Sequence, residues 1–344
     1  MLNVGNQGAK ATKTGTGVKE VIWQQHLAWA SAEAHASGLP KEGQVLFVGS
    51  GTSYYLAQVA AEFGRRRGYH AEARPSEDVV LEPELALDGV ATVVVISRSG
   101  TTSEAVWTME VAREFGVRAV AVTCHGDSPL AQMADHALVS PEGEDDTVVM
   151  IRSFSSMLVL LQHSLADTEL TDLAPYALNV LEQADQAISR LPAWPRRIYL
   201  LGAGVRAGIT QEGALKAQEM SGISASAYSP LEFRHGPRGS VMPEDLVVLL
   251  GQIARVGYEW DVLEDLAKQG ATMWAIAAPG WLEHGRSRGL AVDSIALPDA
   301  VPDMESGPLA VLPLQWLAWN LAVARDRDPD QPQNLSPVVS ITRA

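Results

Sequence analysis

One predicted helix carries the group of side chains best suited to acid–base chemistry. The segment ITQEGALKAQEMSG has helical periodicity, and Glu212, Lys216 and Glu219 fall at intervals of four and three residues within it. This spacing places all three on one face of the helix. A carboxylate on such a face could act as a general base. The alternative is a solvated face with ion pairs within the helix, and the helix taken alone favours that alternative.

A histidine follows in a short turn. The segment LEFRHGPRG contains Glu232, Arg234 and His235, and Gly236 and Pro237 stiffen the turn. A loop histidine is more often a structural hydrogen-bonding group than a catalyst. Beside a sugar-phosphate pocket, however, a carboxylate base and a histidine are the pair that aldose–ketose interconversion needs. One group moves a proton between C1 and C2, and the other opens the ring.

Hydroxyl side chains crowd the start of another predicted helix. The turn SRSGTTSE supplies Ser97, Ser99, Thr101, Thr102 and Ser103. Hydroxyls, a glycine and unpaired backbone N–H groups at a helix N-terminus form an anion site, because the orphan donors and the helix dipole point at the ligand. A capping box between Thr101 and Glu104 would explain two of these residues, but not Ser97 or Ser99. Phosphate binding and helix capping both remain open for the turn alone.

A glycine turn, GSGTS, follows an earlier predicted strand and should lie at the same edge of the sheet. It lacks the third glycine of a dinucleotide-binding fingerprint. The later turn GAGVRAG has Ala207 in that place, and no second strand with a ribose-binding acid follows it. The sequence therefore does not indicate dinucleotide binding.

The elements that must position these turns alternate between short β-branched runs and helical segments. This rhythm predicts βαβ units with parallel sheets that are buried on both faces. It also occurs twice: VLFVGSGTS from Val45 matches IYLLGAGVR from Ile198, with Gly49 aligned to Gly202 at an offset of 153 residues. The prediction is an α/β fold of two duplicated domains, each an αβα sandwich. The expected bounds are a flexible tail at 1–19, a phosphate-binding domain with an N-terminal helix at 20–185, and a second domain with the catalytic helix and a C-terminal tail at 186–344.

Composition limits the classes of function. The chain has 344 residues, 47% of them hydrophobic, which is enough for about two domains. A net charge of −15 gives no support to nucleic-acid or membrane-surface binding. The apolar stretches read as strand-length, too short to cross a bilayer. The single cysteine, Cys124, excludes an internal disulfide and any Cys-based zinc cage, which favours the cytoplasm.

The strings GSGTSY, SRSGTTSE, VVMIRSFSSM, EGALKAQEMSGISASAYSPLEFRHGP and NLSPVVSIT identify a family resemblance. The chain resembles the tandem sugar-isomerase (SIS) family from about Lys41 to the C-terminus. It is similar to the isomerase half of glutamine:fructose-6-phosphate aminotransferases and, more closely, to stand-alone aminosugar-phosphate deaminase/isomerases. The combination of EGALK-x-x-E and HGP is specific to the tandem architecture.

The resemblance implies a role for each matching position. Ser53, Ser97, Ser99 and Thr102 match phosphate-holding residues, and Gly51 and Thr52 match the sugar-contacting turn. Val148 and Met150 match a sugar-lining loop. Glu219 matches the C1/C2 base, and Lys216 matches a lysine of the same helix. His235 matches a ring-opening histidine that reaches the other subunit's site, so a homodimer is implied. Arg98 replaces a glutamine of the phosphate turn; it either adds positive charge near the anion or points to solvent.

Two departures from the aminotransferase pattern bear on the reaction. Residue 2 is Leu2 in place of a cysteine nucleophile, so this chain is not expected to draw ammonia from glutamine. The terminal segment reads Asn334-Leu335-Ser336-Pro337, and no lysine follows Lys268, so the tail has no Schiff-base lysine. The missing lysine favours deamination over synthesis.

The leading expectation is therefore an aminosugar-6-phosphate deaminase/isomerase that needs no metal or organic cofactor. A deglycase for a fructosamine 6-phosphate, which would release an amine, is the second possibility. A non-catalytic sugar-phosphate sensor is the third, but retention of both Glu219 and His235 weighs against it.

Overall fold

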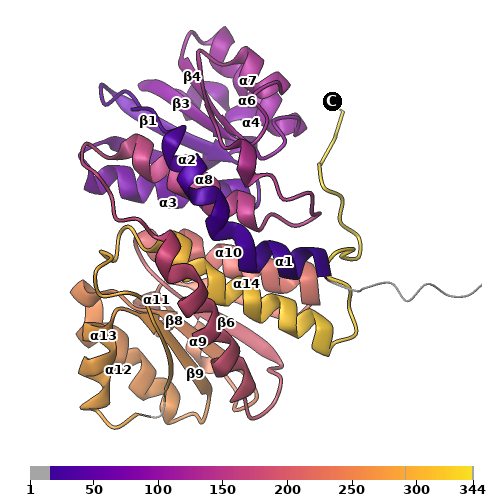
Figure 1. Ribbon diagram of the computed structural model, residues 1–344. Helices are drawn as coiled ribbons and strands as arrows, with labels where there is room; N and C mark the ends of the chain where they lie inside the picture. Colours follow the sequence, from indigo (N-terminus) through magenta and orange to yellow (C-terminus); the bar gives the residue numbers. More distant parts are fainter. Residues whose placement is uncertain (1–15, 291, 343–344) are drawn as a thin grey trace, which may run out of the picture.

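The computed structural model describes residues 16–290 and 292–342 as two α/β domains (Figure 1). The strands of the first domain are β1 (Gln44–Gly49), β2 (His70–Pro75), β3 (Val90–Ile96), β4 (Arg118–Thr123) and β5 (His136–Val139). Its helices are α1 (Thr16–Gln24), α2 (Trp29–Ala34), α3 (Thr52–Arg66), α4 (Ser76–Leu81), α5 (Pro83–Ala86), α6 (Ser103–Glu114), α7 (Pro129–Met133) and α8 (Arg152–Leu165).

The second domain repeats this arrangement. Its strands are β6 (Arg197–Leu201), β7 (Ser224–Tyr228), β8 (Leu246–Leu250), β9 (Thr272–Ala277) and β10 (Asp293–Ala296). Its helices are α9 (Ala177–Ser189), α10 (Val205–Ser221), α11 (Pro230–Phe233), α12 (Val256–Ala267), α13 (Pro279–Arg286) and α14 (Gly307–Ala324). Short 3₁₀ segments lie at Gln25–Ala28, Pro141–Gly143, Ala174–Tyr176, Pro237–Ser240 and Ile253–Arg255.

Both sheets are parallel and have the same topology, which confirms the predicted duplication. The strand order is β2-β1-β3-β4-β5 in one sheet and β7-β6-β8-β9-β10 in the other. The aligned glycine turns also share a backbone conformation: Gly51 has φ 54° and ψ −126°, and Gly204 has φ 58° and ψ −130°. A positive φ suits glycine at both positions because it has no Cβ.

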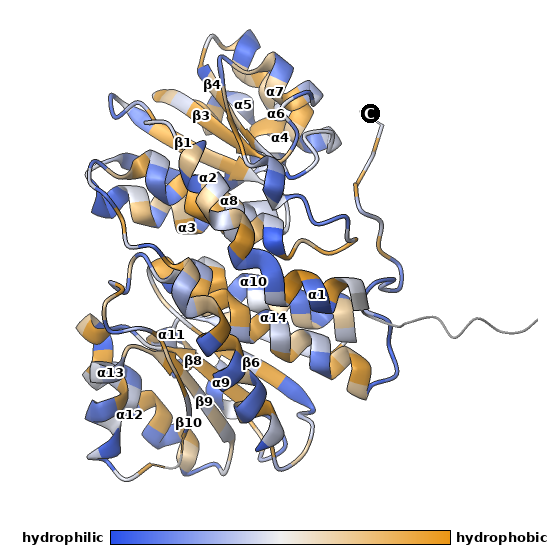
Figure 2. Ribbon diagram, viewed as in Figure 1, coloured by the Kyte–Doolittle hydropathy of each residue, from blue (hydrophilic) through white to orange (hydrophobic). Residues whose placement is uncertain are grey.

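The central strands form because they are nearly continuous apolar runs covered on both faces. Every residue of β8 is buried, and β3 is buried except at Ala91. Figure 2 shows this hydrophobic character along the strands and along the inner helices, including α14. Strands of this type belong inside parallel sheets that helices cover on both sides.

The structure departs from the expected bounds at two places. Residues 1–15 of the expected tail lie outside the described residues, but residues 16–19 are the first turn of α1. The Asp330 carboxylate accepts hydrogen bonds there from the N–H groups of Gly17 (3.1 Å) and Val18 (2.7 Å). The boundary at 185/186 cuts through α9, which packs on α14 and β10 and so belongs to the second domain.

Helix α14 is also longer and more apolar than the sequence reading allowed. By length and composition it could cross a membrane, but 78% of the window is buried inside the protein. It packs mainly against α10 and α9. Its apolar character is therefore explained by its position in the core.

The two domains meet where α10 packs against α3. Gly208 allows the close approach: a Cβ at this position would lie 2.4 Å from the Tyr55 carbonyl oxygen and 2.6 Å from Val59 Cγ2. Real Cβ atoms do not approach backbone this closely, so the helices can cross here only above a glycine.

Gly208→Ala should therefore destabilise the protein by about 1–3 kcal/mol through overpacking, although alanine favours a helix by about 1 kcal/mol. The midpoint of thermal unfolding measures the effect. Gly257→Ala in α12, where nothing lies within 4 Å of the new Cβ, is the matched control and should leave the midpoint unchanged or slightly higher. An equal response of the two variants would contradict the packing argument.

Candidate functional site

The candidate site lies at the carboxyl edge of the first sheet, between β1 and β3. The connections after these strands run in opposite directions, and open α/β sheets bind ligands at such switch points. A cavity of about 200 Å³ opens there. It is lined by every residue predicted for the site except His235: Gly51, Thr52, Ser53, Ser97, Arg98, Ser99, Thr102, Val148, Met150, Lys216 and Glu219.

The turn at residues 97–103, called the hydroxyl turn below, is held by hydrogen bonds within the turn. Ser97 Oγ accepts from Gly100 N–H (3.2 Å), and its hydroxyl donates to Thr102 Oγ1 (3.3 Å). Thr101 donates from its N–H and its hydroxyl to Ser99 Oγ. Helix α6 begins at Ser103 with Thr102 as its N-cap residue, so the alternative of a capping box between Thr101 and Glu104 is not formed. Thr102 and Glu104 at the start of α6 line the cavity, and the N–H of Ser103 donates to the Val339 carbonyl (3.5 Å). The positive end of the α6 dipole therefore lies beside a cavity lined by hydroxyls, as an anion site requires.

Sequence reasoning missed several residues that line the cavity: Ser50, Glu104, Ser336, Pro337 and Val339. Glu104 was considered only as a capping partner, and one of its carboxylate oxygens is buried without a hydrogen bond. The other additions show that the C-terminal segment forms a wall of the cavity. In Figure 1 this segment leaves the end of α14 and runs beside the first domain. Its distance along the chain hid that contact.

Helix α10 brings the acid–base group into the cavity from the second domain. Lys216 is fully buried, and its Nζ lies 3.5 Å from a Glu212 oxygen and donates a hydrogen bond to Glu219 Oε2. Glu212 is also fully buried, whereas the Glu219 side chain keeps 20% of its surface exposed. The solvated-face alternative is therefore wrong. The helix face is a buried carboxylate–ammonium–carboxylate group with Lys216 at its centre, and Lys216 and Glu219 line the cavity.

Burial and charge act in opposite directions in this group. Burial raises the pKa of Glu212 from 4.5 to about 7, and the Glu219 charge adds to the rise although Lys216 opposes it. Burial lowers the pKa of Lys216, but the two carboxylates outweigh it, so its pKa is raised. Lys216 is consequently a cation beside the Glu219 side chain.

Arg98 points neither to solvent nor freely into the cavity. Its side chain is 7% exposed, and its Nη1 donates to Asp145 (3.1 Å) and to the Thr147 carbonyl (2.8 Å). Its Nη2 donates to the Pro337 carbonyl (3.1 Å). The Arg98 side chain thus points into the protein, where its guanidinium is bound by a carboxylate and two backbone carbonyls.

His235 lies outside the cavity. It follows α11 on an exposed turn of the second domain, and only its backbone is fixed there, by a bond from its N–H to the Glu232 carbonyl (2.9 Å). Gly236, with φ 143°, lets the chain turn directly after it. The structure of a single chain does not bring His235 to the Glu219 side chain.

The corresponding turn of the second domain is filled by its own side chains. The Glu259 carboxylate accepts from the Gln252 N–H (2.9 Å) and from the Trp281 indole (2.7 Å). A Cβ on Gly251 would lie 2.5 Å from the Trp281 ring. An internal carboxylate therefore takes the place that an anion would take at the first turn.

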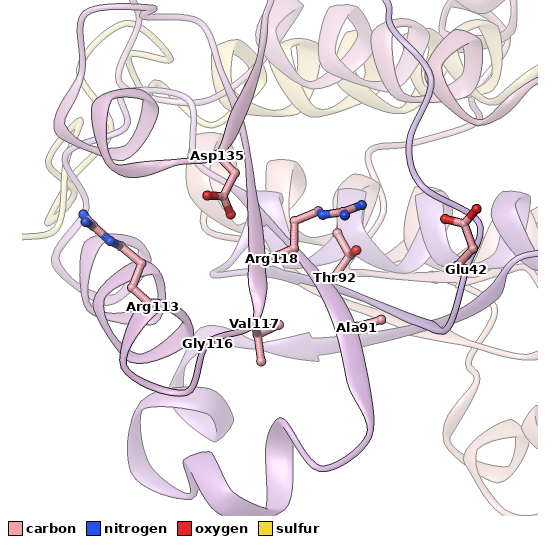
Figure 3. Close-up of a pocket in the computed structure, with 8 residues that line it drawn as sticks. All are labelled: Glu42, Ala91, Thr92, Arg113, Gly116, Val117, Arg118 and Asp135. Carbon is pink, nitrogen blue, oxygen red and sulfur yellow. The ribbon is translucent and has the colours of Figure 1, made fainter.

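A cavity larger than that of the candidate site, about 780 Å³, lies at the opposite edge of the first sheet (Figure 3). Arg118 and Asp135 stand near its centre, while Arg113 and Glu42 lie at opposite ends. These mixed charges do not converge, and the amino ends of parallel strands are not where such sheets bind ligands. Residues 16–290 and 292–342 hold no cluster of His, Cys, Asp and Glu able to bind a metal ion.

Comparisons with known proteins agree with this geometry. The family model described as the SIS domain matches residues 38–166 and 193–323. A glutamine–fructose-6-phosphate aminotransferase of Aeropyrum pernix is 30% identical over 331 residues, which cover 87% of this chain and 51% of that protein. The chain thus spans about half the length of the curated relatives it matches.

Two solved structures show the same fold. A glucosamine-6-phosphate deaminase of Thermotoga maritima is 24% identical with a TM-score of 0.79, and the match covers 94% of this chain and 99% of that one. A tagatose-6-phosphate ketose/aldose isomerase of Escherichia coli is 24% identical with a TM-score of 0.76, covering 96% and 97%.

The raised pKa of Glu212 predicts a pH-dependent stability. Below about pH 4.5 the carboxyl is protonated in both the folded and unfolded states, so it costs nothing; above about pH 7 it is ionised in both, and the full cost of burying the charge is present. As the pH rises between these values, the free energy of unfolding of the native protein should fall by about 2–3 kcal/mol relative to that of a Glu212→Gln variant. Denaturant unfolding at about pH 5 and about pH 8 measures the difference. Glu232→Gln, at an exposed carboxylate, should show none, and a flat difference for Glu212→Gln would contradict the assignment.

Proposed function

Because this chain belongs to the SIS-domain family, with one domain in each half, we propose that it isomerises phosphorylated sugars and, specifically, deaminates an aminosugar 6-phosphate to a ketose phosphate. The observation that carries the proposal is the Lys216–Glu219 pair, which lines the same 200 Å³ cavity as the hydroxyl turn. An anion site and a general base in one cavity are what proton transfer on a sugar phosphate requires.

The hydroxyl turn would hold the phosphate. Ser97, Ser99 and Thr102 offer hydroxyls, and α6 offers the positive end of its dipole. With the phosphate fixed there, the Gly51 turn and the loop carrying Val148 and Met150 would bound the sugar. The far end of the sugar would then meet Lys216 and Glu219.

Glu219 would move the proton. In the open-chain aminosugar it takes the proton from C2, the C2–H electrons form a C1–C2 double bond, and the aldehyde oxygen takes up negative charge that Lys216 stabilises. Return of the proton to C1 gives an imine at C2. Water adds to that imine and ammonia leaves, so aminosugar phosphate and water become ketose phosphate and ammonia.

The tail supports deamination over synthesis. Pro337 lines the cavity at the position where the aminotransferase pattern has a lysine, and proline cannot form a Schiff base. The structural likeness to a protein described as a glucosamine-6-phosphate deaminase shows that the fold assumed in this proposal is one that such a protein has.

One observation favours a second candidate, the deglycase. A further cavity of about 360 Å³ adjoins the site and shares with it Arg98, Ser99, Val148 and Pro337. A substituent on the sugar nitrogen could extend into this space. The same Glu219 chemistry would then release an amine in place of ammonia.

The proposal includes a homodimer in the cytoplasm. His235 does not line the cavity of its own chain, yet its side chain is exposed and available to a second copy. The partner's copy of this histidine would open the sugar ring. A single buried cysteine suits a reducing compartment.

Incubation with a panel of sugar 6-phosphates tests the function. Glucosamine and galactosamine 6-phosphates should each be tried beside fructosamine 6-phosphates, with ammonia, free amine and ketose phosphate measured separately. Ammonia with equimolar ketose phosphate supports deamination, release of an amine supports the deglycase, and binding without turnover of any member contradicts both.

The phosphate clamp gives a prediction of its own. Changing Ser99 and Thr102 together to alanine removes two hydrogen bonds to a charged group, each worth about 1.5–3 kcal/mol, so the KM for the phosphorylated substrate should rise at least about tenfold. The KM for the unphosphorylated sugar serves as the control and should barely move. An unchanged KM for the phosphorylated sugar would show that the turn serves only the start of α6.

Glu219 and His235 can be tested together. Glu219→Gln keeps the side-chain size but removes the proton acceptor, so kcat should fall by about 10²–10⁴ while substrate binding survives. His235→Asn should also lower kcat. If His235 serves the partner's site, co-expression of the two variants rebuilds one intact site per mixed dimer, and activity should rise well above that of either variant. No recovery in the mixture would place His235 elsewhere, and near-native turnover of Glu219→Gln would remove it as the base.

A further inference from the structure

Arg98 lies in the phosphate turn, and both terminal nitrogens of its guanidinium donate to acceptors within the protein. We propose that it is a positioning residue: it ties the C-terminal segment and the loop at 147–150 to the hydroxyl turn, and thereby builds two walls of the cavity instead of binding the phosphate. The proposal rests on the proposed function only in naming the ligand of that cavity.

The first wall is the loop that carries Val148 and Met150. Arg98 Nη1 donates to the carbonyl of Thr147, the first residue of the loop, at 2.8 Å. The same nitrogen donates to Asp145 Oδ1 at 3.1 Å. The other oxygen of Asp145 accepts from the Ile151 N–H at 2.8 Å, immediately after the loop. Arg98 and Asp145 therefore fix both ends of the loop.

Asp145 is itself fixed. It is fully buried at the side chain, and its Oδ2 also accepts from the N–H and the hydroxyl of Ser153 at the start of α8. Because the first turn of a 14-residue helix holds the carboxylate, the carboxylate in turn holds the guanidinium. Arg98 is thus bound on the side away from the cavity and cannot swing to follow a ligand without leaving a buried charge unpaired.

The second wall is the C-terminal segment. Arg98 Nη2 donates to the Pro337 carbonyl at 3.1 Å, across 239 positions of sequence. Further along, Ser103 exchanges hydrogen bonds with Ile341: the serine hydroxyl donates to its carbonyl (3.2 Å) and accepts from its N–H (3.0 Å). Pro337 is the first of these attachments, and Val339 lies between the two. Both residues line the cavity. The segment is pinned at both ends to the two sides of the hydroxyl turn.

The charges around Arg98 also support a positioning role. The Arg98 charge is matched by Asp145 at 3.1 Å and lies 3.9 Å from Glu144, so it adds little net positive potential for a phosphate. The planar guanidinium reaches its three acceptors from two nitrogens held in a rigid fork, whereas a lysine ammonium has all its donors on one nitrogen and a glutamine amide has only two donors. The geometry uses arginine as a three-way connector.

Hydrogen–deuterium exchange tests the proposal without any substrate. In Arg98→Gln, the amides of residues 147–151 and 335–341 should exchange at least about tenfold faster than in the native protein. Ser103→Ala should loosen only the C-terminal segment, because it leaves the Asp145 contacts intact. Arg118→Gln, an exposed arginine on the same sheet, is the matched control and should change neither segment. If Arg98→Gln unfolds because the Asp145 charge is left unpaired, exchange is measured in the double variant Arg98→Gln/Asp145→Asn, which lacks that charge. The same amides should exchange faster in this variant.

Binding of inorganic phosphate separates this role from direct phosphate contact. Loss of the connector should leave the Kd for inorganic phosphate within about threefold, while the KM for the sugar phosphate rises at least about tenfold because the walls are loose. Arg98→Lys should not restore the slow exchange, although it restores the charge. Native exchange rates in residues 335–341 of the Arg98 variants would overturn the proposal, and weaker phosphate binding with those rates unchanged would assign Arg98 to the anion. Because exchange is read on the free protein, a failure of the proposed function leaves this test intact.

Discussion

The structure depends on one buried ammonium group. Lys216 has no exposed surface, and a charge in that position is tolerated only because Glu212 and Glu219 of the same helix stand on either side of it. A buried triad of charges is costly to maintain, and well-packed apolar residues in such a place often stabilise a protein as much or more. Its retention beside a hydroxyl-lined cavity is therefore best explained by chemistry. The close crossing of α10 and α3 over Gly208 serves the same end, because it lets a helix from the second domain deliver Lys216 and Glu219 to the edge of the first.

Duplication gave the molecule two equivalent turns, and side-chain substitution separated their roles. At the first turn, small hydroxyl residues leave a cavity with donors around it. At the second, Glu259 and the Trp281 ring fill the space and satisfy the donors. The second domain thus contributes a helix and a tail to the site, whereas the first contributes the cavity.

Much of this organisation could be read from the sequence. The parallel sheets and their duplication followed from the β-branched runs and the paired glycine turns, and all but one of the predicted site residues share a cavity. Local sequence patterns predicted less where burial or contact depends on segments that are distant in the sequence. Spacing could not show whether the face with Lys216 is buried, since that depends on α3 of the other domain. Nor could it show that Pro337 meets Arg98 across 239 positions, or that Glu104 faces the cavity instead of capping α6. His235 remains a prediction because its partner would be a second chain.

The central claim is that the Lys216–Glu219 pair moves a proton between C1 and C2 of a bound aminosugar phosphate. The most direct measurement follows deuterium placed at C2 of the substrate. The native protein should move part of the label to C1 of the ketose phosphate and lose the rest to water, and the Glu219→Gln variant should release label to neither at a measurable rate. Release of label from C2 at the native rate in that variant would contradict the account.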